Sequence, residues 1–433
     1  MSIAVLFGIF FFLVLIGAPI AICLGAATFT TMMLFTPISP IEVSSMMFEK
    51  VDHYSLMAIP MFILAGNLLS KGSAAQRIIE FAKSIVGHLP GGLPISAIFA
   101  SIIFAAVSGS SPATVVAIGS IMFGAIMQAG YPKKYAVGTI ATAGSLGILI
   151  PPSIVLIVYG VTAEVSIGRL FMAGVVPGIL LGIMLMVVTY IGAVRLGFQR
   201  EEPQPFKVRL AKMKDASWGL MTIVIVIGGI YGGIFTPTEA AAVAAVWAFF
   251  ISVFIYKDIK LSEFYTTTLE SAKTTAMIMF IIANAMLFAH FLTIENIPQM
   301  ITNALVEANV DKYMFLLMVN VLLIIAGSFM EPSAIIMIMV PLLLPVAVAL
   351  GIDPIHFGIV ITINMELGMV SPPVGLNLFV TSGLTGMSIK DVIVATLPWT
   401  LTIFVGLMLV TYIPEIALFL PNLMYGGWYI DYI

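Results

Sequence analysis

One pattern occurs twice in this chain: a Leu-Gly pair, followed after three residues by a Pro-Pro pair, inside a long apolar stretch. It is GSLGILIPPSI at residues 144–154 and MELGMVSPPVG at residues 365–375, 221 positions later. Proline removes a backbone N–H and clashes with the preceding helical turn, so each Pro-Pro pair is expected to break a helix midway. Other correspondences, such as Pro177 with Pro398, recur at nearly the same offset. The chain is therefore predicted to contain two copies of one unit.

The composition decides the class of protein. Hydrophobic residues make up 61% of the 433 residues and charged residues only 9%, whereas a soluble protein has about 25% charged residues. So few charges cannot cover a water-facing surface, and the short alternating segments of a membrane barrel are absent, so an all-α polytopic membrane protein is predicted. The net charge of −3 indicates no nucleic-acid partner, and the single cysteine, Cys23, excludes a disulfide framework.

The basic residues predict the orientation. Six of them lie in the segment 195–214, whereas no lysine or arginine precedes Lys50 or follows Lys390. The positive-inside rule places this segment in the cytoplasm and both termini in the periplasm. Each half then crosses the bilayer an odd number of times, so the two copies are inverted. Inverted repeats built around interrupted helices are typical of secondary transporters.

Each half is predicted to hold a re-entrant helical hairpin followed by a broken helix. The first apolar arm, 94–107, would be only ~21 Å long as a helix, too short for a hydrocarbon core of ~30 Å. The predicted hairpins and broken helices are the hairpin 94–129 with its tip at 108–112, the broken helix 133–163, the hairpin 313–350 with its tip at 326–332, and the broken helix 354–385 with its break at 368–373.

The predicted domains follow from these segments. Residues 73–89 form an amphipathic pattern, which is expected to be an arm lying along the membrane. The boundaries are 1–194 for the first repeat (scaffold helices and arm 1–93, transport-domain hairpin and broken helix 94–166), 195–214 for the cytoplasmic linker, and 215–433 for the second repeat (scaffold helices and arm 215–312, transport-domain hairpin and broken helix 313–386).

A hairpin tip that meets a helix break gathers free carbonyls, hydroxyls and helix N-termini. Such oxygens suit a small hard cation, and helix N-termini favour an anion. Two tip–break pairs around one site therefore predict co-transport of an anion with cations. The alternative is that these Ser, Gly and Pro residues serve only close helix packing or kinks. An ion channel is disfavoured by the occluding hairpins. A membrane-embedded enzyme is disfavoured because no nucleophile–base pair or metal cluster is found.

Several stretches, among them AAVSGSSPATVVAIGSIM, GIFTPTEAAAV and ELGMVSPPVGLNLFV, resemble the large membrane (M) subunit of tripartite ATP-independent periplasmic (TRAP) transporters. This resemblance covers nearly the whole chain. It implies an elevator-type, sodium-coupled importer of an organic anion in the bacterial inner membrane, and not an enzyme. It also implies two partners, a small integral membrane (Q) subunit and a periplasmic substrate-binding (P) protein.

The resemblance further implies a sodium site between tip and break in each repeat, so Na⁺ is expected at two sites or more. The implied sodium ligands are Ser108, Ser111, Gly147, Ile150 and Pro152 in the first site, and Gly327, Gly368, Ser371 and Val374 in the second. The implied substrate-binding residues are Ser110, Ser153, Glu331 and Asn377.

The stretches FMEPSAI and SPPVGLNLFV resemble the C4-dicarboxylate branch of the family, with sialic acid or another sugar acid as the alternative substrate. Three carboxylates keep open roles. Glu331 is either a functional intramembrane carboxylate or a helix cap, Glu366 either reaches the site or makes an interhelical hydrogen bond, and Glu239 is expected to cap a helix.

Overall fold

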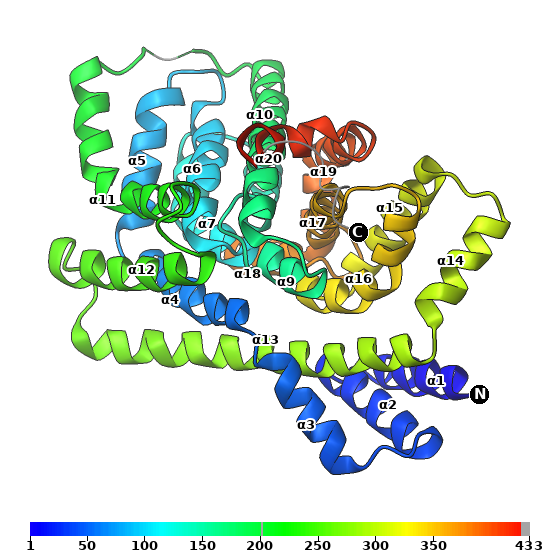
Figure 1. Ribbon diagram of the computed structural model, residues 1–433. Coiled ribbons are helices and arrows are strands. Elements are labelled where there is room, and N and C mark those ends of the chain that lie inside the picture. Colours follow the sequence, from blue (N-terminus) through cyan, green and yellow to red (C-terminus); the bar gives the residue numbers. More distant parts are fainter. Residues whose placement is uncertain (201, 426–433) are drawn as a thin grey trace.

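The structure is a computed structural model that describes residues 1–200 and 202–425, and within these residues the regular secondary structure is helical (Figure 1). Eight of the described helices are long and apolar enough to cross a membrane. They include α10 (Ile167–Arg195), α11 (Phe206–Tyr231) and α13 (Leu261–Ile294). The predicted all-α polytopic class is confirmed.

Helices of the first half recur in the same order in the second half. The equivalent pairs are α6 (Gly92–Ser108) with α15 (Lys312–Gly327), α7 (Ser111–Gln128) with α16 (Pro332–Ala349), α8 (Lys133–Ser145) with α17 (Pro354–Met369), α9 (Ile154–Thr162) with α18 (Leu376–Thr385), and α10 with α19 (Ile389–Tyr412). The remaining helices are α1 (Ser2–Leu15), α2 (Ile20–Phe35), α3 (Pro40–Val51), α4 (Ala58–Lys71), α5 (Ala74–Val86), α12 (Pro237–Phe250), α14 (Ile297–Glu307) and α20 (Glu415–Tyr425). Both hairpins and both broken helices therefore lie where the sequence predicts them.

The two broken helices run in opposite directions. Tyr159, near the end of α9, donates its hydroxyl hydrogen to the Pro354 carbonyl at the start of α17, at 2.6 Å. Val137, near the start of α8, packs in one small buried cluster with Leu378 of α18 and Val392 of α19. The first half of one broken helix thus lies beside the second half of the other, as an inverted repeat requires.

The first hairpin arm is longer than predicted. Helix α6 has 17 residues and begins at Gly92, two residues before Pro94. The backbone N–H groups of the first helical turn have no partner within the helix, so proline is tolerated there and does not delay the helix start. Gly91 precedes the helix with a φ of 77°, a left-handed conformation that glycine adopts without strain.

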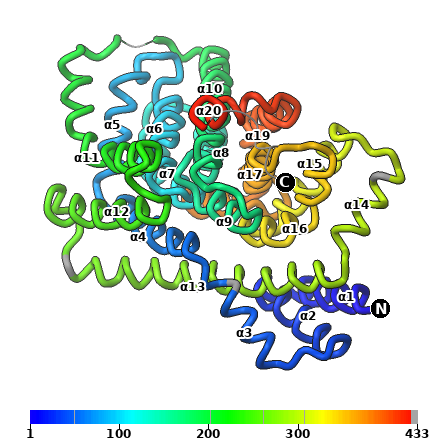
Figure 2. The backbone as a smooth tube through the Cα atoms, in the orientation of Figure 1, coloured from blue at the N-terminus to red at the C-terminus, as the bar shows by residue number. Residues whose placement is uncertain are grey.

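Helix α13 lies along one side of the molecule, with α1, α2 and α3 on one flank and most of the other helices on the other (Figures 1 and 2). It contacts α2, α3, α4 and α16. The predicted arm at 73–89 is α5, which buries Ile78 and Ala82. Glu80 on its polar face lies 3.5 Å from Lys83 and 3.5 Å from Lys212 of α11. The contact with Lys212 joins α5 to the first part of α11, whereas the contact with Lys83 lies within α5.

Candidate functional site

The first hairpin tip lies directly against the first helix break. Gly109 turns the chain between α6 and α7 with a φ of 59°. Its carbonyl accepts a hydrogen bond from the Ile154 N–H at 3.4 Å. A Cβ atom on Gly147 would lie 2.6 Å from the Ser110 carbonyl oxygen, so no larger residue fits there without a shift. The absence of a side chain at Gly147 is what lets tip and break touch.

The second tip meets the second break in the same way. The Ser328 carbonyl accepts hydrogen bonds from the N–H groups of Val374, at 3.1 Å, and Gly375, at 3.2 Å. A Cβ atom on Gly368 would lie 2.6 Å from the carbonyl carbon of Gly327. The Pro-Pro peptide bond in each break is cis. The geometry therefore repeats in both halves of the chain.

A cavity of about 250 Å³ lies where both tip–break pairs face helices α4 and α13. The tips contribute residues 108–113 and 331–333 to its lining. Gly66 of α4 is in close contact with the first tip, because a Cβ atom on Gly66 would lie 3.0 Å from the Ser108 carbonyl oxygen. The described residues that line the cavity include no lysine, arginine or histidine.

Residues 7–416 match the family described as the DctM component of tripartite ATP-independent periplasmic transporters. The chain belongs to this family. It is a component of a membrane transporter and not an enzyme. The words "ATP-independent" agree with the absence of a phosphate-binding G-x-x-x-x-G-K-[S/T] motif from the sequence.

Relatives of this DctM-family chain match it over nearly its whole length. The C4-dicarboxylate TRAP transporter large permease protein DctM of Pseudomonas aeruginosa is 53% identical, over 92% of this chain and 93% of the relative. Its namesake from Rhodobacter capsulatus is 50% identical, over 98% and 100%. A solved structure with the same fold is that of the YdaH transporter of Alcanivorax borkumensis, which is described as having an unusual topology. Its TM-score is 0.66 at 13% identity, and the match covers 90% of this chain and 96% of that one.

Seven of the nine residues in the two predicted sodium sets belong to a tip or touch one: Ser108, Ser111, Gly147, Pro152, Gly327, Gly368 and Val374. Ile150 and Ser371 lie within the two breaks. Ser108 and Ser111 are buried at the first tip, where the Ser108 Oγ lies 2.9 Å from the Thr114 Oγ1. In the second set, the Ser371 hydroxyl donates its hydrogen to the Leu367 carbonyl at 2.7 Å, which leaves the lone pairs of its oxygen free. Their role as sodium ligands stays a prediction.

The four predicted substrate residues divide into two groups. Ser110 and Glu331 line the cavity, whereas Ser153 and Asn377 are fully buried away from its lining. Ser153 caps α9 by accepting a hydrogen bond from the Leu156 N–H at 3.3 Å. Asn377 donates through Nδ2 to the Ser111 Oγ at 2.7 Å, which places it beside the first predicted sodium set.

The carboxylates with open roles are also placed. Glu331 caps α16 by accepting a hydrogen bond from the Ala334 N–H at 3.2 Å, and it lines the cavity as well. Glu239 forms a capping box with Thr236 at the start of α12. Glu366 is fully buried and accepts a hydrogen bond from the Ser145 hydroxyl at 2.9 Å, across the two repeats. Glu331 and Glu239 therefore cap helices and Glu366 makes an interhelical hydrogen bond, while a role of Glu331 or Glu366 in transport stays a prediction.

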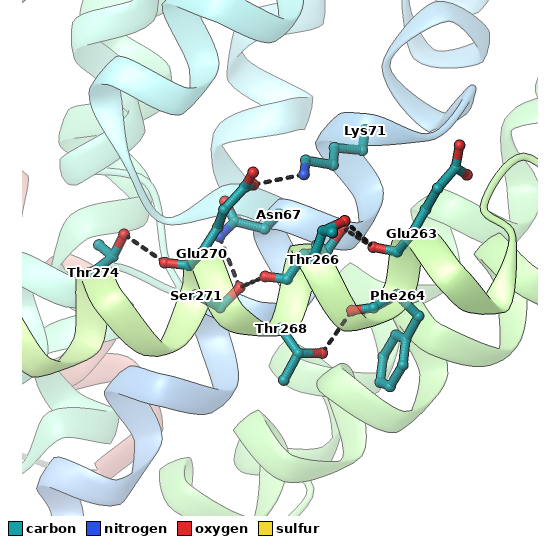
Figure 3. A network of polar contacts seen from close by, with 10 residues as sticks. Asn67, Lys71, Glu263, Phe264, Thr266, Thr268, Glu270, Ser271 and Thr274 are labelled. Atoms are coloured by element: carbon teal, nitrogen blue, oxygen red, sulfur yellow. Dashed lines mark hydrogen bonds and ion pairs between the residues drawn. The ribbon is translucent and has the colours of Figure 1, made fainter.

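Sequence reasoning missed the part of the cavity wall that α4 and α13 supply, above all Asn67 and Thr274. Figure 3 shows that Asn67 faces Ser271, and its Nδ2 lies 2.9 Å from the Ser271 Oγ. A signal was present in the run TTTLESAKTT at residues 266–275, which makes the first part of an otherwise apolar membrane helix polar. Polar residues inside a membrane span mark functional surfaces.

Proposed function

We propose that this chain is the permease subunit of an importer for an organic anion, a C4-dicarboxylate or a similar carboxylate, driven by sodium influx. The observation that carries this proposal is the cavity formed by both tip–break pairs together. An anion bound there would contact both repeats and the two scaffold helices α4 and α13 at once.

Helix N-termini would supply the attraction for the anion. Helices α7 and α16 begin at the cavity, with Ser111 and Pro332 among its lining residues, and α9 and α18 begin there with Ile154 and Leu376. The unsatisfied N–H groups and the dipole at a helix N-terminus favour negative charge. The N-termini of α9 and α16 already have caps, Ser153 and Glu331, so the N-termini of α7 and α18 would supply most of this attraction, in the absence of a lysine or arginine among the described lining residues.

The first tip–break contact fits a cation. Carbonyl and hydroxyl oxygens are the ligands that hard cations prefer, and Ser108 and Ser111 place two buried hydroxyl oxygens there. The Oδ1 atom of Asn377 is buried and has no hydrogen-bond partner within the described residues, although its Nδ2 reaches Ser111. We therefore assign Asn377 to the cation site, where its Oδ1 atom would be a further oxygen ligand.

The proposed mechanism is an elevator. Hairpins, breaks and the bound solutes would move together past α4 and α13. The close contact between Gly66 of α4 and Ser108 of the first tip is one point where the two parts would slide. A glycine here removes the side chain that would otherwise block that movement.

The proposed setting is the bacterial inner membrane, with residues 195–214 in the cytoplasm and both termini in the periplasm. The family description names a tripartite transporter. The two remaining parts would be a small integral membrane subunit and a periplasmic binding protein that delivers the substrate.

C4-dicarboxylates are favoured over sialic acid or another sugar acid because the relatives at 53% and 50% identity carry that substrate in their names.

The test of the proposed function is uptake of labelled succinate into proteoliposomes that contain this chain and its small subunit, with the binding protein outside. Uptake should require an inward sodium gradient and stop when an ionophore collapses it. Equal uptake in potassium alone would refute sodium coupling, and uptake of a sugar acid but not of succinate would select the alternative substrate.

A further inference from the structure

Helix α13 has two exposed faces of opposite character. One carries apolar residues at helical spacing, Tyr265, Leu269, Ala272, Ala276 and Phe280. The other carries polar residues at the same kind of spacing, Glu263, Thr266, Glu270, Lys273 and Thr274. The apolar face suits lipid. The charged residues of the other face, Glu263, Glu270 and Lys273, precede the apolar stretch at 277–294 and need water or a partner beside them. The polar face therefore indicates an aqueous path along α13.

This polar face continues the wall of the cavity. Thr274 and Met277 line the cavity, and Glu263 lies 11 residues before Thr274. At 1.5 Å per helical residue this stretch is about 16 Å long. It leads from the cavity to the start of α13, three residues after Asp258. Asp258 accepts a hydrogen bond from the Ser73 N–H at 2.6 Å, so the loop between α4 and α5 meets the loop before α13 there.

Helix α4 lies on the other side of this path, with Asn67 and Lys71 facing Ser271 and Glu270 of α13 (Figure 3). Asn67 lines the cavity and bonds to Ser271, and Lys71 follows one turn later on α4. Lys71 forms an ion pair with Glu270 at 2.5 Å, and the two side chains are 41% and 57% exposed. A fixed positive charge therefore stands on the path just beyond a cavity whose described lining has none.

We propose that Lys71 is a second, transient binding station for the carboxylate of the transported anion, with Glu270 as the internal group that displaces it. An exposed ion pair contributes little to stability because water screens it, so a passing carboxylate can take the place of Glu270. Glu270 then reclaims Lys71 and releases the anion. This inference deepens the proposed function and rests on it.

The test measures how strongly succinate inside the proteoliposomes inhibits succinate uptake. Proteoliposomes with the complete transporter are preloaded with graded unlabelled succinate, and the initial uptake of labelled succinate is recorded. Lys71→Gln should raise the internal concentration that halves uptake by about threefold to fivefold, the scale of one exposed charge. Glu270→Gln should lower that concentration, because Lys71 loses its competitor. The double variant should behave like Lys71→Gln, since Glu270 acts only through Lys71.

The matched control is Lys83→Gln, which removes a lysine from another partly exposed ion pair, with Glu80 on α5. It should leave the half-inhibiting concentration unchanged. An unchanged value in Lys71→Gln, or an equal shift in Lys83→Gln, overturns the station at Lys71 while wild-type transport stands. Absence of sodium-dependent succinate uptake by the wild type would instead defeat the proposed function itself.

Discussion

Ser111 joins three separate parts of the site. It is the first residue of α7, it is fully buried, and its Oγ accepts a hydrogen bond from Asn377 of the second repeat at 2.7 Å. Its Cα would also lie 2.9 Å from a Cβ atom on Gly147 in the first break. One small side chain thus links a tip, a break and the opposite repeat.

Ser111→Ala should weaken sodium binding and leave the fold intact. The change removes a hydroxyl oxygen that a methyl group cannot replace, which costs on the order of 1–3 kcal/mol and roughly tenfold or more in affinity. The sodium concentration for half-maximal uptake should rise accordingly, and Ser108→Ala should act in the same direction. Normal expression with an unchanged sodium dependence in both variants would make these serines packing residues.

Gly368→Ala should lower the melting temperature in detergent and abolish uptake. Alanine usually stabilises a helix relative to glycine by roughly 0.5–1 kcal/mol, but here its Cβ would lie 2.6 Å from the carbonyl carbon of Gly327. Overpacking of this kind costs about 1–3 kcal/mol. The control is Gly124→Ala in α7, where a Cβ would meet no atom within 4 Å. A Gly368→Ala variant as stable and active as Gly124→Ala would contradict the close tip–break contact.

At the scale of elements, α4 contacts both α13, which is proposed to stay fixed, and the first hairpin tip, which is proposed to move. Its side toward α13 is held by the bond between Asn67 and Ser271, whereas Gly66 touches the hairpin tip at Ser108. In an elevator the first contact persists throughout the cycle and the second must break. In the proposed elevator, α4 would therefore be where the fixed and moving parts can be told apart.

Two engineered disulfides distinguish these contacts. Gly66→Cys with Ser108→Cys should abolish succinate uptake when oxidised. When reduced, the pair should recover uptake only in part and need more sodium, because Ser108 is a predicted sodium ligand and a side chain at position 66 crowds the first tip. Asn67→Cys with Ser271→Cys, whose side chains face each other at hydrogen-bond distance, should leave uptake largely unchanged. The natural Cys23 is fully buried and can remain. Full uptake by the oxidised Gly66–Ser108 pair would show that this tip does not move past α4.

At the scale of the whole molecule, the two repeats meet at equivalent residues. Ser145 and Glu366 are 221 positions apart and each precedes a Leu-Gly pair, and they form a hydrogen bond in the buried core. The pseudo-symmetry axis of the inverted repeat therefore passes close to this contact. Ser145 and Glu366 each lie two residues before a glycine of a break, Gly147 and Gly368, so their contact is near both predicted sodium sites.

The inverted repeat also gives a topology that can be measured. Alkaline phosphatase is active only in the periplasm, so a fusion after residue 433 should be active and a fusion near residue 205 inactive. The six basic residues of the segment 195–214 are the reason for this expectation. The opposite pattern of activity would reverse the assignment of both faces of the membrane.

The sequence alone determined the helices, the tips and the breaks, because these follow from local causes. Apolar length, the prolines at 151–152 and 372–373, and glycines such as Gly109 act within a few residues along the chain. The order of helices in the second half could be predicted for the same reason, since it repeats the pattern of the first.

Only the tertiary structure decided which groups meet. Asn377 lies 266 positions from Ser111, and Asn67 lies 204 positions from Ser271, yet each pair is in hydrogen-bond contact. No local pattern encodes such a pairing, because it depends on how helices from both repeats pack against one another. Packing thus placed Asn377, a predicted substrate residue, beside Ser111 of the first tip, and it built one wall of the cavity from α4 and α13.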